Sequence, residues 1–188
     1  MVVLRPAVGT IVFVLLVPGS VVGIVPWLLS RWRLEAPLLG WTGFRWVGIA
    51  LFLFGMPVLG EAMVRFVREG RGTPAPILPT ERLVAAGLYR HVRNPMYIGV
   101  VSMILGQGFF FGSRAVTLYA ACAAVAFHLF VRLYEEPTLH ARFGAEYDTY
   151  TRQVPRWRPR LTPWVSGGPT EGPEPGLECK SGRGIGEA

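Results

Sequence analysis

The sequence predicts an all-α integral membrane protein with about four transmembrane helices and a C-terminal interfacial helix on the cytoplasmic side. Three observations lead to this fold class. Of the 188 residues, 51% are hydrophobic and only 16% are charged, which is too apolar for an ordinary soluble domain. Four apolar runs are separated by polar segments. The formal charge of +7 comes almost entirely from arginines that flank these runs.

The first two apolar runs predict two transmembrane helices within residues 1–64. Residues 7–29 carry no charge and, at 1.5 Å per residue, can cross a hydrocarbon core of roughly 30 Å. No small-residue cleavage pattern follows, so we do not interpret this run as a cleaved signal peptide. Residues 44–64 form the second span, in which Pro57 favours a kink.

The third and fourth runs predict an antiparallel pair of helices, at residues 96–111 and 115–133. Only a few residues separate them, so the pair must form a tight hairpin. Three small residues on the third run allow another helix to approach closely: Gly99, Ser102 and Gly106. Before this hairpin, residues 65–93 are polar and rich in arginine, glycine and proline, which predicts an ordered loop or a lid.

The C-terminal part predicts one peripheral helix and a tail. Residues 135–160 are expected to lie on the membrane and to end in a basic, aromatic surface anchor, Val154-Pro-Arg-Trp-Arg-Pro-Arg160. Residues 161–188 are rich in glycine, proline and acids, and we expect disorder. Residues 65–160 then form the functional core, and residues 1–64 its N-terminal membrane part.

The arginine distribution predicts the orientation. Arginines are more frequent in the loop at 65–93 and in residues 132–160 than in the two opposite loops. By the positive-inside rule, both termini should be cytoplasmic. The membrane is expected to be the cell (inner) membrane. Because the arginines flank apolar runs and do not form a solvated stripe, nucleic-acid binding is not expected. Cys122 and Cys179 indicate neither a disulfide framework nor a metal site.

Residues 87–99 combine basic, aromatic and helix-breaking residues at the start of the third span. Pro95 suits the first helical turn, which gives Asn94 the N-cap position. The basic residues then lie beside the positive end of the helix dipole, where a carboxylate or phosphate can bind. They are Arg90, His91 and Arg93. A basic cluster that only sets topology would carry the same charges.

An acidic pair, Glu135 and Glu136, follows the fourth span. The hairpin should return this pair to the side where the third span begins, and thus near Tyr97. Adjacent carboxylates there need a partner or solvent. The candidate partners are Arg90, Arg93 and Arg132. A solvated helix end is the alternative interpretation. His128, inside the fourth span, is expected to be a hydrogen-bonded packing residue, and His140 a surface residue.

These motifs together resemble a known family. Arg93-Asn-Pro-Met-Tyr-Ile-Gly99, then Leu133-Tyr-Glu-Glu-Pro137, then Phe143-Gly-x-Glu-Tyr-x-x-Tyr150 and Val154-Pro-Arg156 are similar to motifs of integral-membrane methyltransferases. These include the isoprenylcysteine carboxyl methyltransferases and the phospholipid N-methyltransferases. The Asn-Pro-Met-Tyr and Tyr-Glu-Glu-Pro runs are closer to the phosphatidylethanolamine enzymes. The Phe-Gly and Val-Pro-Arg parts are closer to the prenylcysteine enzymes.

The resemblance implies S-adenosylmethionine as cofactor and methyl donor, and a lipophilic acceptor such as a phospholipid amine or an isoprenylcysteine-like carboxylate. It also implies the donor contacts. Glu81, Arg82, Leu83 and Val84 match the segment over the nucleoside; Tyr89, Asn94, Pro95, Met96 and Tyr97 match residues around the methionine part; Glu135 and Glu136 match the acidic pair. Arg93 or the helix N-terminus can hold the donor carboxylate.

The acceptor chemistry remains open between two classes. A carboxylate acceptor needs no base, whereas an ammonium acceptor must lose a proton to His91, to Glu136 or to bulk water. Arg132 is a candidate partner for an anionic acceptor group. Two other functions compete with methyl transfer. They are an NADPH-dependent sterol-type reductase, against which the Tyr-Glu-Glu-Pro run argues, and a non-enzymatic membrane protein.

Overall fold

The computed structural model describes residues 18–69 and 83–165. Every regular element in these ranges is helical, in agreement with the predicted all-α class. In chain order they are η1 (Ser20–Ile24), α2 (Val25–Ser30), η2 (Leu38–Gly40), α3 (Gly43–Glu69), η3 (Gly87–Arg90), α4 (Pro95–Phe111), α5 (Arg114–Phe130), η4 (Val131–Glu135), α6 (Glu136–Phe143) and α7 (Ala145–Gln153).

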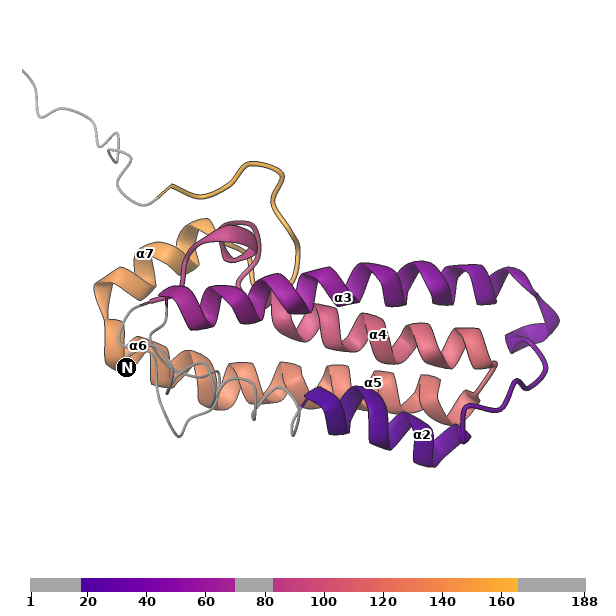
Figure 1. Ribbon diagram of the computed structural model, residues 1–188. Helices are drawn as coiled ribbons and strands as arrows, with labels where there is room; N and C mark the ends of the chain where they lie inside the picture. Colours follow the sequence, from indigo (N-terminus) through magenta and orange to yellow (C-terminus); the bar gives the residue numbers. More distant parts are fainter. Residues whose placement is uncertain (1–17, 70–82, 166–188) are drawn as a thin grey trace, which may run out of the picture.

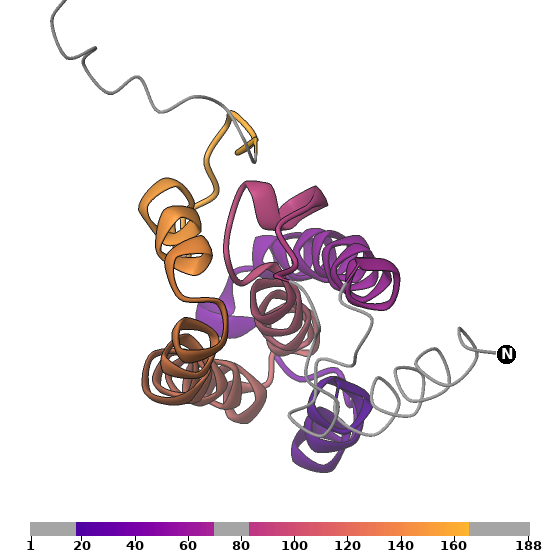
Figure 2. The ribbon, with the colours of Figure 1, turned by 90° about the vertical axis from the view of Figure 1, so that its left-hand side faces the viewer.

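Helix α4 lies in the middle of the bundle and packs against α3, α5 and α2 (Figures 1 and 2). The C-terminal end of α3, the N-terminal end of α4 and the C-terminal end of α5 lie together at one end of the molecule, with η3 and α7. We call this the motif end. The opposite end carries η2 and the turn from α4 to α5.

Two helices of the described part are long and apolar enough to cross a membrane, Gly43–Arg65 and Arg114–Phe143. Helix α4 has 17 residues, which is about 26 Å at 1.5 Å per residue and slightly less than a typical hydrocarbon core. Only the end of the predicted first span, from residue 18 onward, lies within the described residues. The described residues are therefore consistent with a membrane-type helical fold that has two candidate spans, fewer than the four predicted.

Helices α3 and α4 meet along a seam of glycines. A Cβ atom on Gly106 would lie 2.7 Å from the carbonyl oxygen of Gly48, and one on Gly55 would lie 2.6 Å from that of Gly99. Larger residues at these positions would separate the backbones, so the glycines permit the close approach. This confirms the packing role predicted for Gly99 and Gly106 and identifies α3 as the partner.

The turn between α4 and α5 confirms the predicted hairpin. Helix α4 ends at Gly112, whose φ of +76° favours glycine. Ser113 is the N-cap of α5, and its hydroxyl accepts a hydrogen bond from the backbone N–H of Val116 at 3.5 Å. The two helices thus run antiparallel and place the start of α4 near the end of α5.

The prediction of one peripheral helix over residues 135–160 was wrong. Helix α5 continues through the π-turn η4 into α6, which carries the polypeptide without a break to Phe143. The direction of the backbone then reverses at Gly144, which has φ +49° and ψ −124°. Few residues other than glycine adopt this conformation. After α7 the backbone leaves helical geometry, and residues 154–164 run as an irregular segment that we call the C-terminal strap.

Candidate functional site

Turn η3 is held against the end of α3. Gly87, at φ +56°, lies so close to Glu61 that a Cβ atom would overlap the carboxylate. The other oxygen of Glu61 accepts from the backbone N–H of Leu88 at 3.4 Å, and Glu61 also pairs with Arg65 at 2.8 Å. The glycine therefore allows η3 to dock on α3, and Glu61 keeps it in place.

The centre of the site joins α4 to η4. The hydroxyl of Tyr97 donates to Oε2 of Glu135 at 2.9 Å, and the Tyr97 ring packs on Phe127, with 4.8 Å between ring centroids. The Asn-Pro-Met-Tyr motif and the acidic pair are thus in direct contact, although 38 residues separate Tyr97 from Glu135. The sequence-based expectation that the hairpin brings these motifs together is confirmed.

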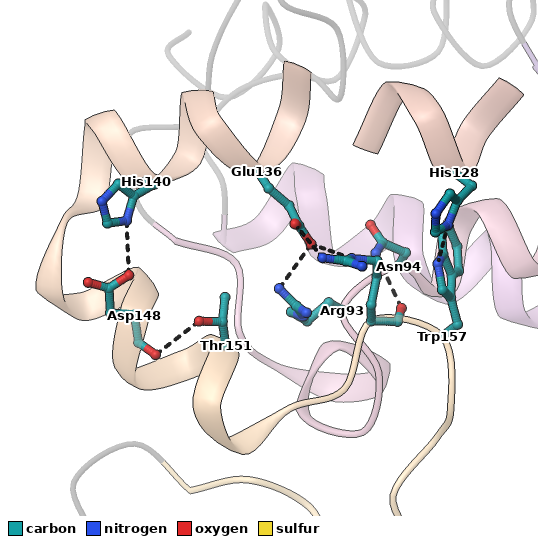
Figure 3. A network of polar contacts seen from close by, with 9 residues as sticks. Arg93, Asn94, His128, Glu136, His140, Asp148, Thr151 and Trp157 are labelled. Atoms are coloured by element: carbon teal, nitrogen blue, oxygen red, sulfur yellow. Dashed lines mark hydrogen bonds and ion pairs between the residues drawn. The ribbon is translucent and has the colours of Figure 1, made fainter. Parts of the chain in front are cut away.

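Glu136 is enclosed by two arginines (Figure 3). Arg156 donates to both carboxylate oxygens, at 2.6 Å and 2.7 Å, and Arg93 donates to one of them at 3.0 Å. The side chains are 14% (Arg93), 18% (Glu136) and 28% (Arg156) exposed, so solvent screens these ion pairs only partly. The hydrogen bonds to Glu136 raise the pKa of Arg156, which stays charged.

The two adjacent acids therefore differ. Both carboxylate oxygens of Glu136 accept hydrogen bonds from arginines. Glu135, within the described part of the chain, accepts one hydrogen bond, from Tyr97. Arg93 and Arg156 balance the formal charge of the pair. Glu135 is consequently the acid with capacity left for a further hydrogen-bond donor.

The C-terminal strap runs along η3 and the start of α4 and is fastened by backbone hydrogen bonds. They run from Arg93 N to Pro155 O, from Arg160 N to His91 O, and from Trp164 N to Arg90 O, each at 3.0 Å. Residues 154–160 of the strap were predicted to be a membrane-surface anchor. Within the protein, the strap covers the motif from which the donor contacts were predicted.

Motif side chains also hold the strap. Arg90 donates through Nε to the carbonyl oxygen of Trp164, and Asn94 donates to that of Arg156 at 3.2 Å. Asn94 does occupy the N-cap position of α4, but its side chain forms no capping hydrogen bond. The predicted N-cap position is therefore confirmed, and the side-chain amide binds the strap.

His91 is oriented by the same contacts. Its Nδ1 lies 2.8 Å from the carbonyl oxygen of Arg160. A carbonyl oxygen can only accept, so Nδ1 carries the proton and a neutral His91 keeps its lone pair on Nε2. His128 is bound to the strap in turn, since its Nδ1 accepts from Nε1 of Trp157 at 3.0 Å (Figure 3). This agrees with the packing role expected for His128.

The other predicted donor contacts line an apolar part of the site. Val84, Tyr89 and Met96 pack with Ala62 of α3. Leu83 packs against the cluster of Tyr147, Tyr150 and Val154. The hydroxyl of Tyr150 donates to the carbonyl oxygen of Tyr89 at 2.7 Å, and burial raises the pKa of both tyrosines, so they stay neutral.

Some predicted residues lie apart from this centre. Arg132 is exposed and, among the described residues, pairs with neither acid. Glu81 and Arg82 lie outside the described residues. The partner that sequence reasoning missed is Arg156. It stands in the Val-Pro-Arg run, and the signal that could have found it is the need of two adjacent acids for a second cation.

A sequence model of the phospholipid methyltransferase family matches residues 44–146, which is more than half of the chain. The chain belongs to the phospholipid methyltransferase family. Comparison with curated proteins and with solved structures gave no match. Membership in the phospholipid methyltransferase family implies a methyltransferase associated with a membrane, as the motifs predicted. The matched residues include the contact between Tyr97 and Glu135 and end before the C-terminal strap.

Proposed function

We propose that this phospholipid methyltransferase family member transfers a methyl group from S-adenosylmethionine to a lipophilic acceptor at the cytoplasmic face of the cell (inner) membrane. The observation that carries the proposal is the hydrogen bond from Tyr97 to Glu135. It joins the two motifs at one end of the bundle, where soluble donor and membrane-bound acceptor can both arrive.

The residues around this contact fit the donor chemically. Glu135 has one carboxylate oxygen without a hydrogen bond from the described residues, which suits the amino group or the ribose hydroxyls. Within the described ranges, the backbone groups of Leu83 and Val84 form no hydrogen bonds with other backbone, and we propose that they bind the adenine edge. The ring of Tyr97 is an aromatic face to which a sulfonium is attracted.

The arginines act by holding the acids in place. Arg156 and Arg93 fix Glu136, the first residue of α6, through three hydrogen bonds. The adjacent Glu135 is thereby oriented toward Tyr97 without an arginine of its own among the described residues. We therefore propose that Glu136 positions Glu135 and does not act as the base. We also propose that Arg93 binds Glu136 and not the carboxylate of the donor.

Bound S-adenosylmethionine supplies an electrophilic methyl group on a sulfonium. What these residues contribute is alignment and exclusion of water, and alignment alone can lower a barrier by roughly 7 to 11 kcal/mol. The strap covers the motif and removes solvent from it. A lipophilic acceptor would approach between α4 and α5, beside Tyr97 and Phe127.

The protonation state of His91 bears on the acceptor. With Nδ1 committed to the carbonyl oxygen of Arg160, Nε2 is the basic nitrogen, and it can accept a proton from an ammonium acceptor. A carboxylate acceptor would not need it and would instead favour the exposed cation of Arg132. His91→Gln therefore separates the two acceptor classes.

The test uses the purified full chain with methyl-labelled S-adenosylmethionine and total membrane lipid, followed by mass spectrometry of the labelled product. We expect a labelled lipid, and we expect Glu135→Gln to weaken donor binding at least tenfold. Glu146→Gln is the matched control, because Glu146 is an exposed acid of α7. Donor binding that is equal in wild type and Glu135→Gln, or a thermal shift with NADPH and none with S-adenosylmethionine, would refute the proposal.

A further inference from the structure

An apolar groove of about 380 Å³ lies far from the candidate site, between α3 and α4. Its volume is within the range of small-molecule sites, about 300–1,000 Å³. It is lined by Trp32, Gly48, Ile49, Phe52, Leu53, Gly106, Gln107, Phe110 and Phe111. The lining residues that belong to α3 and α4 lie in the half of each helix that is nearer the turn from α4 to α5.

Helix geometry separates the groove from the candidate site. Gly106 is nine residues from Tyr97, which is about 14 Å along α4 and about half a turn around its axis. Tyr97 faces Phe127 of α5, whereas Gly106 faces Gly48 of α3. The groove is thus neither a continuation of the methyl-transfer site nor directed toward it.

The lining offers an occupant almost nothing polar to bind. Gln107 is the only side chain in it with an amide, and that amide is already used: its Nε2 donates to Val22 O at 2.7 Å, and its Oε1 accepts from Trp32 Nε1 at 3.2 Å. Leu53 is 61% exposed on the outer face of α3. A hydrocarbon chain is the occupant that fits such a surface.

The positive charge of Arg45 lies on the face of α3 that lines the groove, although Arg45 itself is not part of the lining. Gly48, Ile49 and Phe52 lie within about 60° of Arg45 around the axis of α3, so Arg45 is on the same face, one turn nearer the helix start. Arg45 Nη2 donates to the carbonyl oxygen of Glu35 at 2.9 Å; among the described residues its Nε has no partner and no carboxylate pairs with its charge.

We propose that this groove binds one membrane phospholipid from the leaflet opposite the candidate site. Its acyl chain lies along α3 from Ile49 to Leu53, and its phosphate lies beside Arg45. A guanidinium without a carboxylate partner favours a phosphate, and Trp32, an exposed residue of the lining, is a residue type suited to the membrane interface. The proposal requires a bilayer around the helices but not the identity of the methyl acceptor.

The experiment places the full chain in bilayer nanodiscs that contain a phosphatidylglycerol with a photoreactive acyl chain. After irradiation, mass spectrometry maps the labelled residues. We expect labelling to concentrate on the groove, at Phe52 and Phe110. Arg45→Gln, which removes the charge, should lower this labelling about tenfold, as expected for the loss of one hydrogen bond to a charged group. Ile49→Trp, which fills the groove, should also lower it, because the acyl chain no longer fits.

Two control variants keep the result specific. Arg114→Gln removes an exposed arginine at the same end, and Leu118→Trp adds the same bulk on an exposed face of α5. Neither should change the labelling of the groove. Labelling spread evenly over α3 and α5, equal labelling in Arg45→Gln and wild type, or cross-linked dimers through the groove would overturn the proposal. The label map of the wild type decides the matter even where a variant fails to fold.

Discussion

At the scale of single residues, the site divides two adjacent carboxylates into different tasks. Glu136 is neutralised by arginines from two distant segments, whereas Glu135 is bonded to a tyrosine. Sequence alone showed that a Glu-Glu pair at the end of a span needs compensation, but it could not show which arginine provides it. The choice depends on the strap, whose Arg156 lies 20 residues further on.

Removing the hydroxyl of Tyr97 tests directly whether Glu135 has a different role from Glu136. In Tyr97→Phe the ring stays on Phe127 while Glu135 loses the one hydrogen bond that the described residues give it. We expect the KM for the donor to change several-fold, with thermal stability nearly unchanged. The measurement is steady-state kinetics at varied donor concentration. An unchanged KM and kcat would show that the orientation of Glu135 is irrelevant.

Arg156 provides a second test at this scale. Arg156→Ala leaves Glu136 with only Arg93, and the loss of two charge-assisted hydrogen bonds should destabilise the fold by about 1–3 kcal/mol. It should also weaken donor binding. Arg156→Lys keeps the charge but not the two-point contact, so it should recover part of both losses. The measurements are calorimetric donor binding and thermal unfolding of the wild type and both variants. An Arg156→Lys variant that is as unstable and binds the donor as weakly as Arg156→Ala would contradict the role of charge.

At the scale of elements, hydropathy and small-residue spacing predicted α3, α4, α5 and the hairpin, because each depends on local composition. The peripheral helix was predicted wrongly, since Gly144 was treated as part of a helix. The path of the strap was not predicted. Three of its contacts join residues more than 60 positions apart through backbone groups alone, which every residue has and which therefore leave no sequence signal.

The glycine seam can be tested with a control from the same helix. Gly55→Ala would place a Cβ 2.6 Å from the carbonyl oxygen of Gly99, so α3 and α4 must separate, at a cost of about 1–3 kcal/mol. At Gly60 nothing lies within 4 Å, and Gly60→Ala should instead stabilise α3 slightly, because alanine favours helix. Thermal unfolding in detergent measures both. Equal effects at the two positions would argue against a close seam.

At the scale of the whole molecule, the strap ties the C-terminal part to the motif end of the bundle. A chain shortened after residue 153 would lose the partners of Arg90, His91 and Asn94, and we expect it to lose donor binding. A chain shortened after residue 165 retains every contact described here and should keep its activity. Donor binding by both chains, measured in the same detergent, checks this; equal binding would show that the strap is dispensable.

The strap has a consequence for how the protein matures. Its hydrogen bonds join Arg90 to Trp164, and these residues are 74 positions apart in the sequence. Arg156 and Trp164 leave the ribosome only after the acidic pair and the apolar runs that precede it. The proposed donor site is therefore completed only when the strap has followed the helices out of the ribosome and has docked on η3 and α4.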